Sequence, residues 1–200
     1  MEQGGTPALR EASNFFISEG HVFSALRKIT SRLDELGIAY AVADGMALFH
    51  HGYRRFTEDV DILVTREGMR AAHDHLEVLG YLPPFRNSKN LRDTEHGVRI
   101  EFLIAGEYPG DGKPKPVAFP EPASVAVDID GIKYLSLPAI VELKLASGMT
   151  NPRRMKDLSD VQELISLLHL PRDFADQLSP YVQPKFFELW DAIANAPPDP

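Results

Sequence analysis

Hydrophobic residues recur along this chain at two different spacings, and each spacing predicts one kind of element. Val22, Leu26, Ile29 and Leu33 follow one another at intervals of three or four residues, as on one face of a helix, and Gly37 can end that helix. Strands are predicted where hydrophobic and polar residues alternate, or where a short hydrophobic run lies between turn residues. These patterns predict helices over residues 22–36, 45–51, 69–79, 136–147 and 158–168, and strands over 38–43, 59–64, 90–93, 98–105, 125–129 and 132–135.

The order of these elements predicts an α/β (α+β) fold, because helices and strands alternate early and helices alone close the chain. Both chain ends lack any hydrophobic period, so we expect them to be flexible. The predicted organisation is a flexible N-terminus over 1–12, one domain over 13–170, a helical C-terminal extension of that domain over 171–196, and a flexible tail over 197–200.

Glycine and proline mark the predicted turns and helix ends. The helix over 69–79 is expected to be capped near Thr65. Gly148 is expected to end the helix over 136–147, and Ser179 with Pro180 to start a later one. Asp130 followed by Gly131 is a strong signal for a two-residue hairpin turn. Between residues 106 and 122, repeated prolines and glycines predict a long surface loop.

Composition narrows the class of protein. At 200 residues, with 44% hydrophobic and 25% charged positions, the chain is of the size and kind of one globular domain. The absence of cysteine excludes a disulfide framework, a thiolate zinc site and a cysteine nucleophile. A net charge of −8 argues against a broad nucleic-acid or anionic-membrane surface. No membrane-spanning or signal-peptide pattern is present, so we expect a cytoplasmic protein.

The densest chemistry lies between residues 42 and 64. A strand leads through a small-residue turn into a short helix, and a second strand carries Asp59 and Asp61 on one face. Backbone N–H groups at such a turn can bind phosphate, and two neighbouring carboxylates suit magnesium bridging a triphosphate. Asp128 and Asp130 repeat the D-x-D pattern, but the hairpin turn at Gly131 already explains them.

This segment resembles the nucleotidyltransferase fold of the DNA polymerase beta superfamily, and is most similar to its bacterial AbiEii-type and related minimal members. The resemblance covers residues 38–168 and implies a nucleotidyltransferase-like mixed β-sheet flanked by helices. It is carried by a small-residue turn, a D-x-D strand, a lysine-bearing helix and a basic helix. The matching residues are Gly45, Ala47, Leu48, Gly52, Arg55, Thr57, Asp59, Asp61, Lys144, Lys156, Asp157 and Asp160.

The resemblance also implies a reaction, in which an NMP group passes from a nucleoside triphosphate such as ATP to an acceptor hydroxyl. Asp59 and Asp61 would hold two Mg²⁺ ions, and Glu101 is the best match for the third carboxylate of the site. Contacts to the nucleotide would come from Gly45, Met46, Arg55, Thr57, Lys144, Lys156 and Asp160. The acceptor is a protein, an RNA end or a small molecule, and a toxin–antitoxin role would add a cognate antitoxin as partner.

Several of these residues have a plainer alternative role. Glu101 either binds metal or acts as a base, or else it lies at a sheet edge or forms a structural ion pair, because a charge within an apolar run is costly unless it is used or paired. Arg55 is either structural or close to phosphate. Lys144 either extends its ammonium out of an apolar helix face or contacts phosphate. Lys156 forms a basic cluster with Arg153 and Arg154, which is either a solvated helix start or a contact to the acceptor or the nucleotide.

Asp44 departs from the family pattern, which has a small residue at this position. Its carboxylate either points at the triphosphate, where a second metal would have to offset the repulsion, or caps the following helix. Two functions therefore stay open from the sequence. The chain is a nucleotidyltransferase, or it is a catalytically silent nucleotide- or partner-binding module of the same fold.

Overall fold

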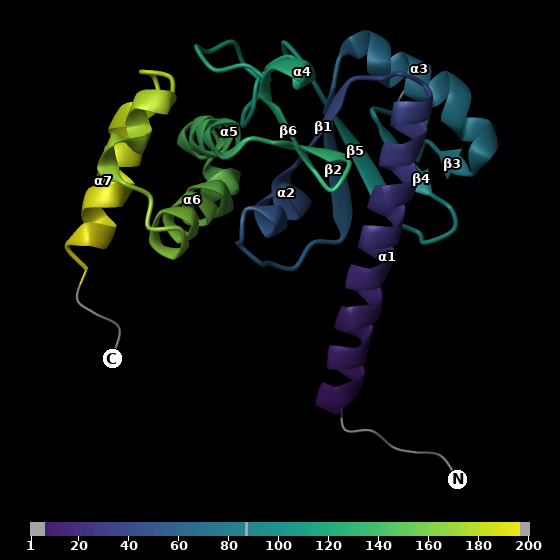
Figure 1. Cartoon of the computed structure of the whole chain (residues 1–200), viewed down its shortest axis with the longest axis horizontal. Helices are drawn as coiled ribbons and strands as arrows, with labels where there is room; N and C mark the ends of the chain where they lie inside the picture. Colours follow the sequence, from purple (N-terminus) through teal and green to yellow (C-terminus); the bar gives the residue numbers. More distant parts are fainter. Residues whose placement is uncertain (1–6, 87, 197–200) are drawn as a thin grey trace.

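The computed structural model describes residues 7–86 and 88–196, and in this part of the chain seven strands form one mixed sheet flanked by helices (Figure 1). The strands are β1 (Tyr40–Ala43), β2 (Asp59–Val64), β3 (Tyr81–Leu82), β4 (Asn90–Asp93), β5 (Arg99–Ile104), β6 (Ala126–Ile129) and β7 (Ile132–Leu135). Their order in the sheet is β3-β4-β5-β2-β1-β7-β6. The predicted α/β fold class is thus confirmed.

Helices cover the sheet from different sides. The α-helices are α1 (Pro7–Glu35), α2 (Asp44–His50), α3 (Arg66–Leu76), α4 (Pro122–Val125), α5 (Leu137–Thr150), α6 (Met155–Leu167) and α7 (Gln183–Ala194). Short 3-10 helices are η1 (Glu77–Leu79), η2 (Pro152–Arg154) and η3 (Arg172–Gln177). In the view of Figure 1, α5, α6 and α7 lie to the left of the sheet and α3 at its upper right, while β3 and β4 lie to the right of α1.

Strand β2 lies at the centre of the sheet and joins its two halves. It runs antiparallel to β1 and parallel to β5. Val60, Ile62 and Val64 are fully buried on one face of β2, as the alternation predicts. The aspartates at positions 59 and 61 therefore emerge on the other face, where the sheet is open to a cavity.

Several local signals read from the sequence mark a helix end or a turn correctly. Gly37 has a φ of +65° after α1, a left-handed conformation that glycine adopts without strain. Thr65 caps α3 by accepting a hydrogen bond from the backbone N of Gly68 at 2.9 Å. Asp130 and Gly131, with φ of +53° and +81°, form the predicted hairpin turn between β6 and β7.

Gly148 does not end α5, contrary to expectation. The helix continues to Thr150, and a Cβ added at Gly148 would lie 2.5 Å from Cγ of Leu158 on α6. The glycine is there because α5 and α6 pack too closely for a side chain at this position. This contact holds α6 and its acidic residues against α5.

Three further elements differ from the prediction, because the local sequence signals do not determine their bounds. Helix α1 begins at Pro7, so residues 7–12 of the segment expected to be flexible are helical, while residues 1–6 and 197–200 lie outside the described residues. Strand β3 was not predicted, because it is only two residues long. Helix α7 begins at Gln183, several residues after Ser179 and Pro180.

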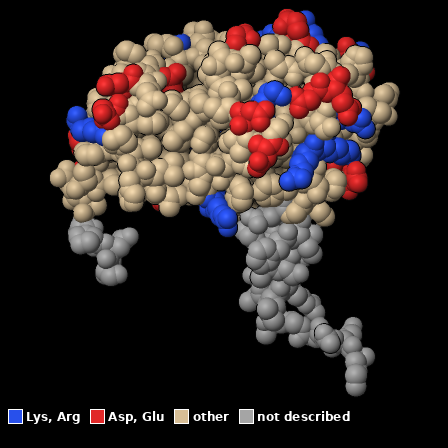
Figure 2. Space-filling view, in the orientation of Figure 1, with Lys and Arg blue, Asp and Glu red and all other residues tan. Residues whose placement is uncertain are grey.

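The surface of the protein carries charges of both signs. On the face shown in Figure 2, Lys and Arg side chains are scattered among Asp and Glu side chains. None of the helices in residues 7–86 and 88–196 combines the length and the apolar composition that a membrane span requires.

Candidate active site

A cavity of about 380 Å³ opens where β1, β2 and β5 face helices α5 and α6. Acidic residues from four elements meet in it, together with Lys144 of α5. The loop expected over 106–122 also contributes, since Pro109, Gly110 and Phe119 line one wall. The acidic lining residues are Asp44, Asp59, Asp61, Glu101 and Asp157.

Two aspartates of β2 line the cavity together, as the strand period predicts. Asp59 and Asp61 alternate with the buried Val60 and Ile62, so both carboxylates leave the same face of the strand. In the described part of the chain neither carboxylate forms an ion pair with a basic side chain. Their negative charge is therefore left uncompensated by direct contacts.

Electrostatics around Asp61 reflect this crowding. Burial raises the pKa of Asp61 well above its usual value, and the nearby carboxylates of Asp44, Asp59 and Glu101 raise that pKa further. Lys144 acts in the opposite direction but does not outweigh them. A cation bound beside Asp61 would relieve this repulsion.

Glu101 occupies the neighbouring strand β5, directly opposite Asp61 in the parallel register. Its carboxylate accepts a hydrogen bond from the guanidinium of Arg99, two residues earlier on the same strand face. Among the described residues, the triads whose ligand atoms all lie within 4.8 Å of one another do not include Asp59, Asp61 and Glu101. Glu101 therefore lines the cavity but is turned toward Arg99.

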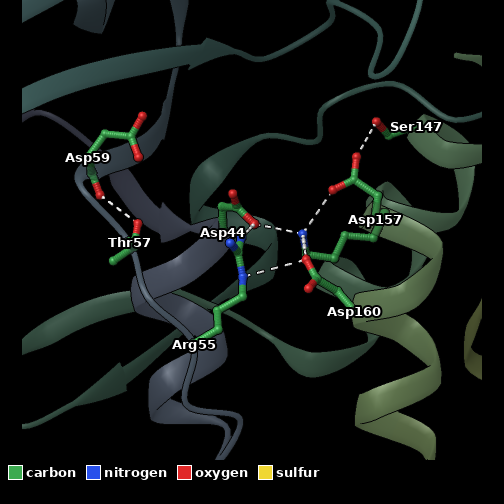
Figure 3. A network of polar contacts seen from close by, with 8 residues as sticks. Asp44, Arg55, Thr57, Asp59, Ser147, Asp157 and Asp160 are labelled. Carbon is green, nitrogen blue, oxygen red and sulfur yellow. Dashed lines mark hydrogen bonds and ion pairs between the residues drawn. The ribbon is translucent and has the colours of Figure 1, made fainter. Parts of the chain in front are cut away.

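The ammonium of Lys144 lies at the centre of a charge network and bonds to three carboxylates. Figure 3 shows these carboxylates, which belong to Asp44, Asp157 and Asp160, pointing toward one another. The Nζ of Lys144 donates to Asp44 at 2.6 Å, to Asp157 at 3.0 Å and to Asp160 at 2.7 Å. Because an ammonium has three N–H donors, each of them has a carboxylate partner. Burial lowers the pKa of Lys144, but attraction to Asp44, Asp157 and Asp160 outweighs burial and holds that pKa above its usual value.

Arg55 adds a second cation to this network. Its Nη2 donates to Oδ1 of Asp44 at 2.6 Å, the same oxygen that accepts from Lys144. Its Nε is buried without a hydrogen-bond acceptor and lies 3.6 Å from Oδ2 of Asp160. Burial favours the neutral form of Asp44, but Lys144 and Arg55 outweigh burial and lower the pKa of Asp44 to about 2.

Asp44 does not cap α2, so the capping role considered from the sequence is wrong. Ala43 occupies the N-cap position, and no side chain caps this helix end. Asp44 instead adopts a φ of +43°, a left-handed conformation that is unusual for a residue other than glycine. Its carboxylate lies against two buried cations, and charge-assisted hydrogen bonds to them are stronger than a cap.

Comparison with solved structures identifies the fold. The chain aligns with the solution structure of the antibiotic-resistance factor ANT(2'')-Ia at a TM-score of 0.54, with 15% identity over 86% of this chain and 94% of that one. The chain has the nucleotidyltransferase fold. No family model and no curated protein sequence matches the chain.

Two further structures align over similar lengths. The crystal structure of ANT(2'')-Ia in complex with adenylyl-2''-tobramycin gives a TM-score of 0.49, with 15% identity over 86% of this chain and 95% of that one. An antigenic nucleotidyltransferase-like protein from Paracoccidioides brasiliensis also gives 0.49, with 17% identity over 86% and 93%.

Within the nucleotidyltransferase fold, the residues singled out from the sequence fall into three groups. Asp59, Asp61, Glu101 and Lys144 line the cavity. Arg55 and Asp160 are not among its lining residues, but they belong to the charge network around Asp44 and Lys144. The remaining four do not line it: they are Gly45, Met46, Thr57 and Lys156.

Close packing explains Gly45 and its neighbours. A Cβ added at Gly45 would lie 2.7 Å from Cβ and Oγ1 of Thr57, so glycine lets the segment before β2 cross the start of α2. Met46 is buried in the core. The hydroxyl of Thr57 donates to the backbone O of Asp59 at 3.2 Å and so fixes the entry into β2. Lys156 is exposed at the start of α6.

The sequence analysis named Asp157 as part of the family pattern but gave it no role in the site, and it did not single out Ser147 at all. Asp157 binds Lys144 through Oδ1 and accepts a hydrogen bond from the hydroxyl of Ser147 at 2.6 Å through Oδ2. A signal for Asp157 was present, because it precedes Asp160 by three residues and therefore shares its helix face. Arg99, which lines the cavity, gave no comparable signal. Arg154 also lines it, and the sequence had marked this residue as part of a basic cluster.

Proposed function

We propose that this protein is a metal-dependent nucleotidyltransferase that moves an NMP group from a nucleoside triphosphate to an acceptor hydroxyl. The observation that carries the proposal is the placement of Asp59 and Asp61 on one face of β2, beside Glu101 on the parallel neighbour β5, in a cavity large enough for a nucleotide's phosphates. The nucleotidyltransferase fold of the chain supports the same reaction class.

The chemistry of the carboxylates in the cavity supports the proposal of two magnesium ions. Magnesium prefers hard oxygen ligands, and Asp59 and Asp61 offer carboxylates that no basic side chain neutralises by direct contact. Glu101 would complete the set after its carboxylate turns away from Arg99. Four carboxylates lie near one another in this cavity, and bound cations would offset the repulsion between them.

Each residue then has a defined task in the reaction. The oxygen of the acceptor hydroxyl attacks the α-phosphorus, the bond from that phosphorus to the bridging oxygen breaks, and pyrophosphate leaves. Glu101 would accept the proton of the acceptor hydroxyl, while Arg99 and Arg154 on the cavity wall would stabilise negative charge on the phosphates. Magnesium, when bound, supplies charge neutralisation and alignment of the phosphates.

One observation favours a second candidate, the catalytically silent module of the same fold. Every N–H donor of Lys144 is occupied by a carboxylate, and Arg55 also binds Asp44. These two cations are therefore already paired and are not free to bind a phosphate in the cavity. The resemblance to AbiEii-type proteins would make either version a cytoplasmic toxin–antitoxin component with ATP as one candidate nucleotide. The acceptor would be a protein, an RNA end or a small molecule, and an antitoxin would be the partner.

Transfer of label tests the proposal directly. The protein is incubated with magnesium, cell extract and each nucleoside triphosphate labelled at the α-phosphate, and we expect the label to appear in an acceptor. Asp59→Asn should abolish incorporation. Asp128→Asn is the matched control, because Asp128 belongs to the second D-x-D pair and only accepts from the backbone N of Gly131 in a turn. Nucleotide binding without any incorporation would favour the silent module.

A further inference from the structure

Asp44 differs from the other carboxylates around Lys144 in its access to solvent. Its side chain is 34% exposed, whereas those of Asp157 and Asp160 are 11% and 2% exposed and that of Lys144 is 7% exposed. Asp44 also lines the cavity, directly after the end of β1. Of the three carboxylates that hold Lys144, Asp44 is therefore the one that can be exchanged without opening the protein interior.

The contacts of Asp44 are those that a phosphate group would make. Its Oδ1 accepts from Nζ of Lys144 and from Nη2 of Arg55, both at 2.6 Å. Phosphate oxygens are acceptors of the same kind, and both ammonium and guanidinium groups bind them. In the arrangement described here Lys144 has no N–H donor left for a phosphate, because its other two donors bind Asp157 and Asp160.

The backbone of Asp44 is also consistent with a residue that can move. Its φ of +43° is strained for an aspartate, and the two ion pairs offset that strain. Once another anion binds Lys144 and Arg55, the Asp44 carboxylate loses the two contacts that hold it in this position. Lys144 would remain in place because Asp157, fixed by the hydroxyl of Ser147, and Asp160 still bind it.

We propose that Asp44 is a displaceable internal competitor for phosphate, which occupies the donors of Lys144 and Arg55 until a phosphate group of the incoming nucleotide takes them. The inference rests on the proposed function, since it concerns the same cavity and the same substrate. It makes Asp44 a residue that sets phosphate affinity. The exchange replaces one anion with another, so the buried cations are never left unpaired.

Binding of magnesium pyrophosphate, the product expected whatever the base, tests the inference. Isothermal titration calorimetry compares the unchanged protein with Asp44→Asn, which keeps the shape of the side chain and removes its charge. We expect the variant to bind pyrophosphate about tenfold more tightly or better, because the phosphate no longer competes with a charge-assisted hydrogen bond. Asp44→Gly, which also removes the strain of the left-handed backbone conformation, should likewise bind pyrophosphate more tightly than the unchanged protein.

Asp130→Asn is the matched control. Asp130 is the other described aspartate with a positive φ, at +53°, and it lies in the β6–β7 turn outside the cavity. The control makes the same change in net charge, so we expect it to leave pyrophosphate affinity unchanged. Equal affinity of the unchanged protein and both Asp44 variants would overturn this inference alone. Absence of binding by all of these proteins would overturn the proposed function as well.

Discussion

Asp61 on β2 and Glu101 on β5 are direct register partners on two parallel strands, and both line the cavity. On the other side of Asp61, its register partner on β1 is Ala43, the residue before Asp44. Neighbouring strands lie about 4.8 Å apart, so the backbone ladder holds these carboxylates near one another. The backbones of these residues cannot separate without breaking the sheet, so only a rotation of the side chain, such as that of Glu101 toward Arg99, reduces the repulsion. Several negatively charged side chains therefore stay close together in the cavity, and a bound cation would stabilise the folded protein by reducing their repulsion.

Magnesium should therefore stabilise the protein against heat. We expect the midpoint of thermal unfolding to rise with magnesium concentration, because the ion binds the folded cavity and not the unfolded chain. In Asp61→Asn the metal-free protein should melt higher than the unchanged protein, since one of the crowded carboxylates is gone, and its response to magnesium should be smaller. Differential scanning calorimetry measures both. An unchanged midpoint for the original protein at millimolar magnesium would contradict the metal site.

Catalysis should depend on Asp61 more strongly than folding does. Asp61→Asn is expected to lower metal-dependent transfer by at least about a hundredfold, as is typical when a preorganised electrostatic contact to the transition state is lost. Circular dichroism should show the same helix and strand content for both proteins. Turnover of the variant at the original rate would show that Asp61 has no part in the reaction.

The charge network should respond to acid in a defined window. The pKa of Asp44 falls from 3.8 to about 2 in the folded protein, because attraction to Lys144 and Arg55 outweighs burial. Because the pKa of Asp44 is lower in the folded state, its carboxylate stabilises the fold at pH values above 3.8, the pKa of the unfolded state. This contribution is lost as the pH falls from 3.8 toward 2. The unfolding free energies of the original protein and Asp44→Asn should therefore converge across this range in urea titrations. A constant difference down to pH 2 would show that Asp44 is not held as a carboxylate.

Removing Lys144 should destabilise the protein strongly. Lys144→Met leaves the buried Asp157 and Asp160 without their ammonium partner, and breaking a buried ion pair in this way costs about 3–5 kcal/mol. Lys156→Met is the matched control, because Lys156 is exposed on α6, and it should change the unfolding free energy by less than about 0.5 kcal/mol. Urea denaturation compares the two. Similar values for both variants would mean that the Lys144 network does not contribute to stability.

Gly148 should not tolerate a methyl group. In Gly148→Ala the new Cβ would lie 2.5 Å from Cγ of Leu158, so α5 and α6 have to shift, at a cost of about 1–3 kcal/mol in unfolding free energy. Gly20 provides the control within α1, since a Cβ there meets nothing within 4 Å. Gly20→Ala should instead stabilise the helix by up to about 1 kcal/mol. Equal effects of the two substitutions would contradict the close packing of α5 on α6.

Local sequence signals predicted much of the fold. The strand over 59–64 was predicted with its observed bounds and its two faces, because the period of two is set by the backbone of the strand itself. The cap at Thr65 and the hairpin turn at Asp130 and Gly131 were predicted for the same reason, since each depends on neighbours in sequence. Gly148 misled the prediction because its cause is a residue of another helix, Leu158.

The sequence by itself determined the order of elements and the common face of Asp59 and Asp61, through periods and turn residues that act over a few positions. Only the tertiary structure decided the partners of Asp44, which binds Lys144 from 100 residues away, and brought Asp157 into the same network. Charge pairing acts through space, and the partner that a buried charge finds depends on which helices pack beside it. For this reason the sequence showed that Asp44 is unusual for the family pattern, whereas its contacts depend on how α5 and α6 pack beside it.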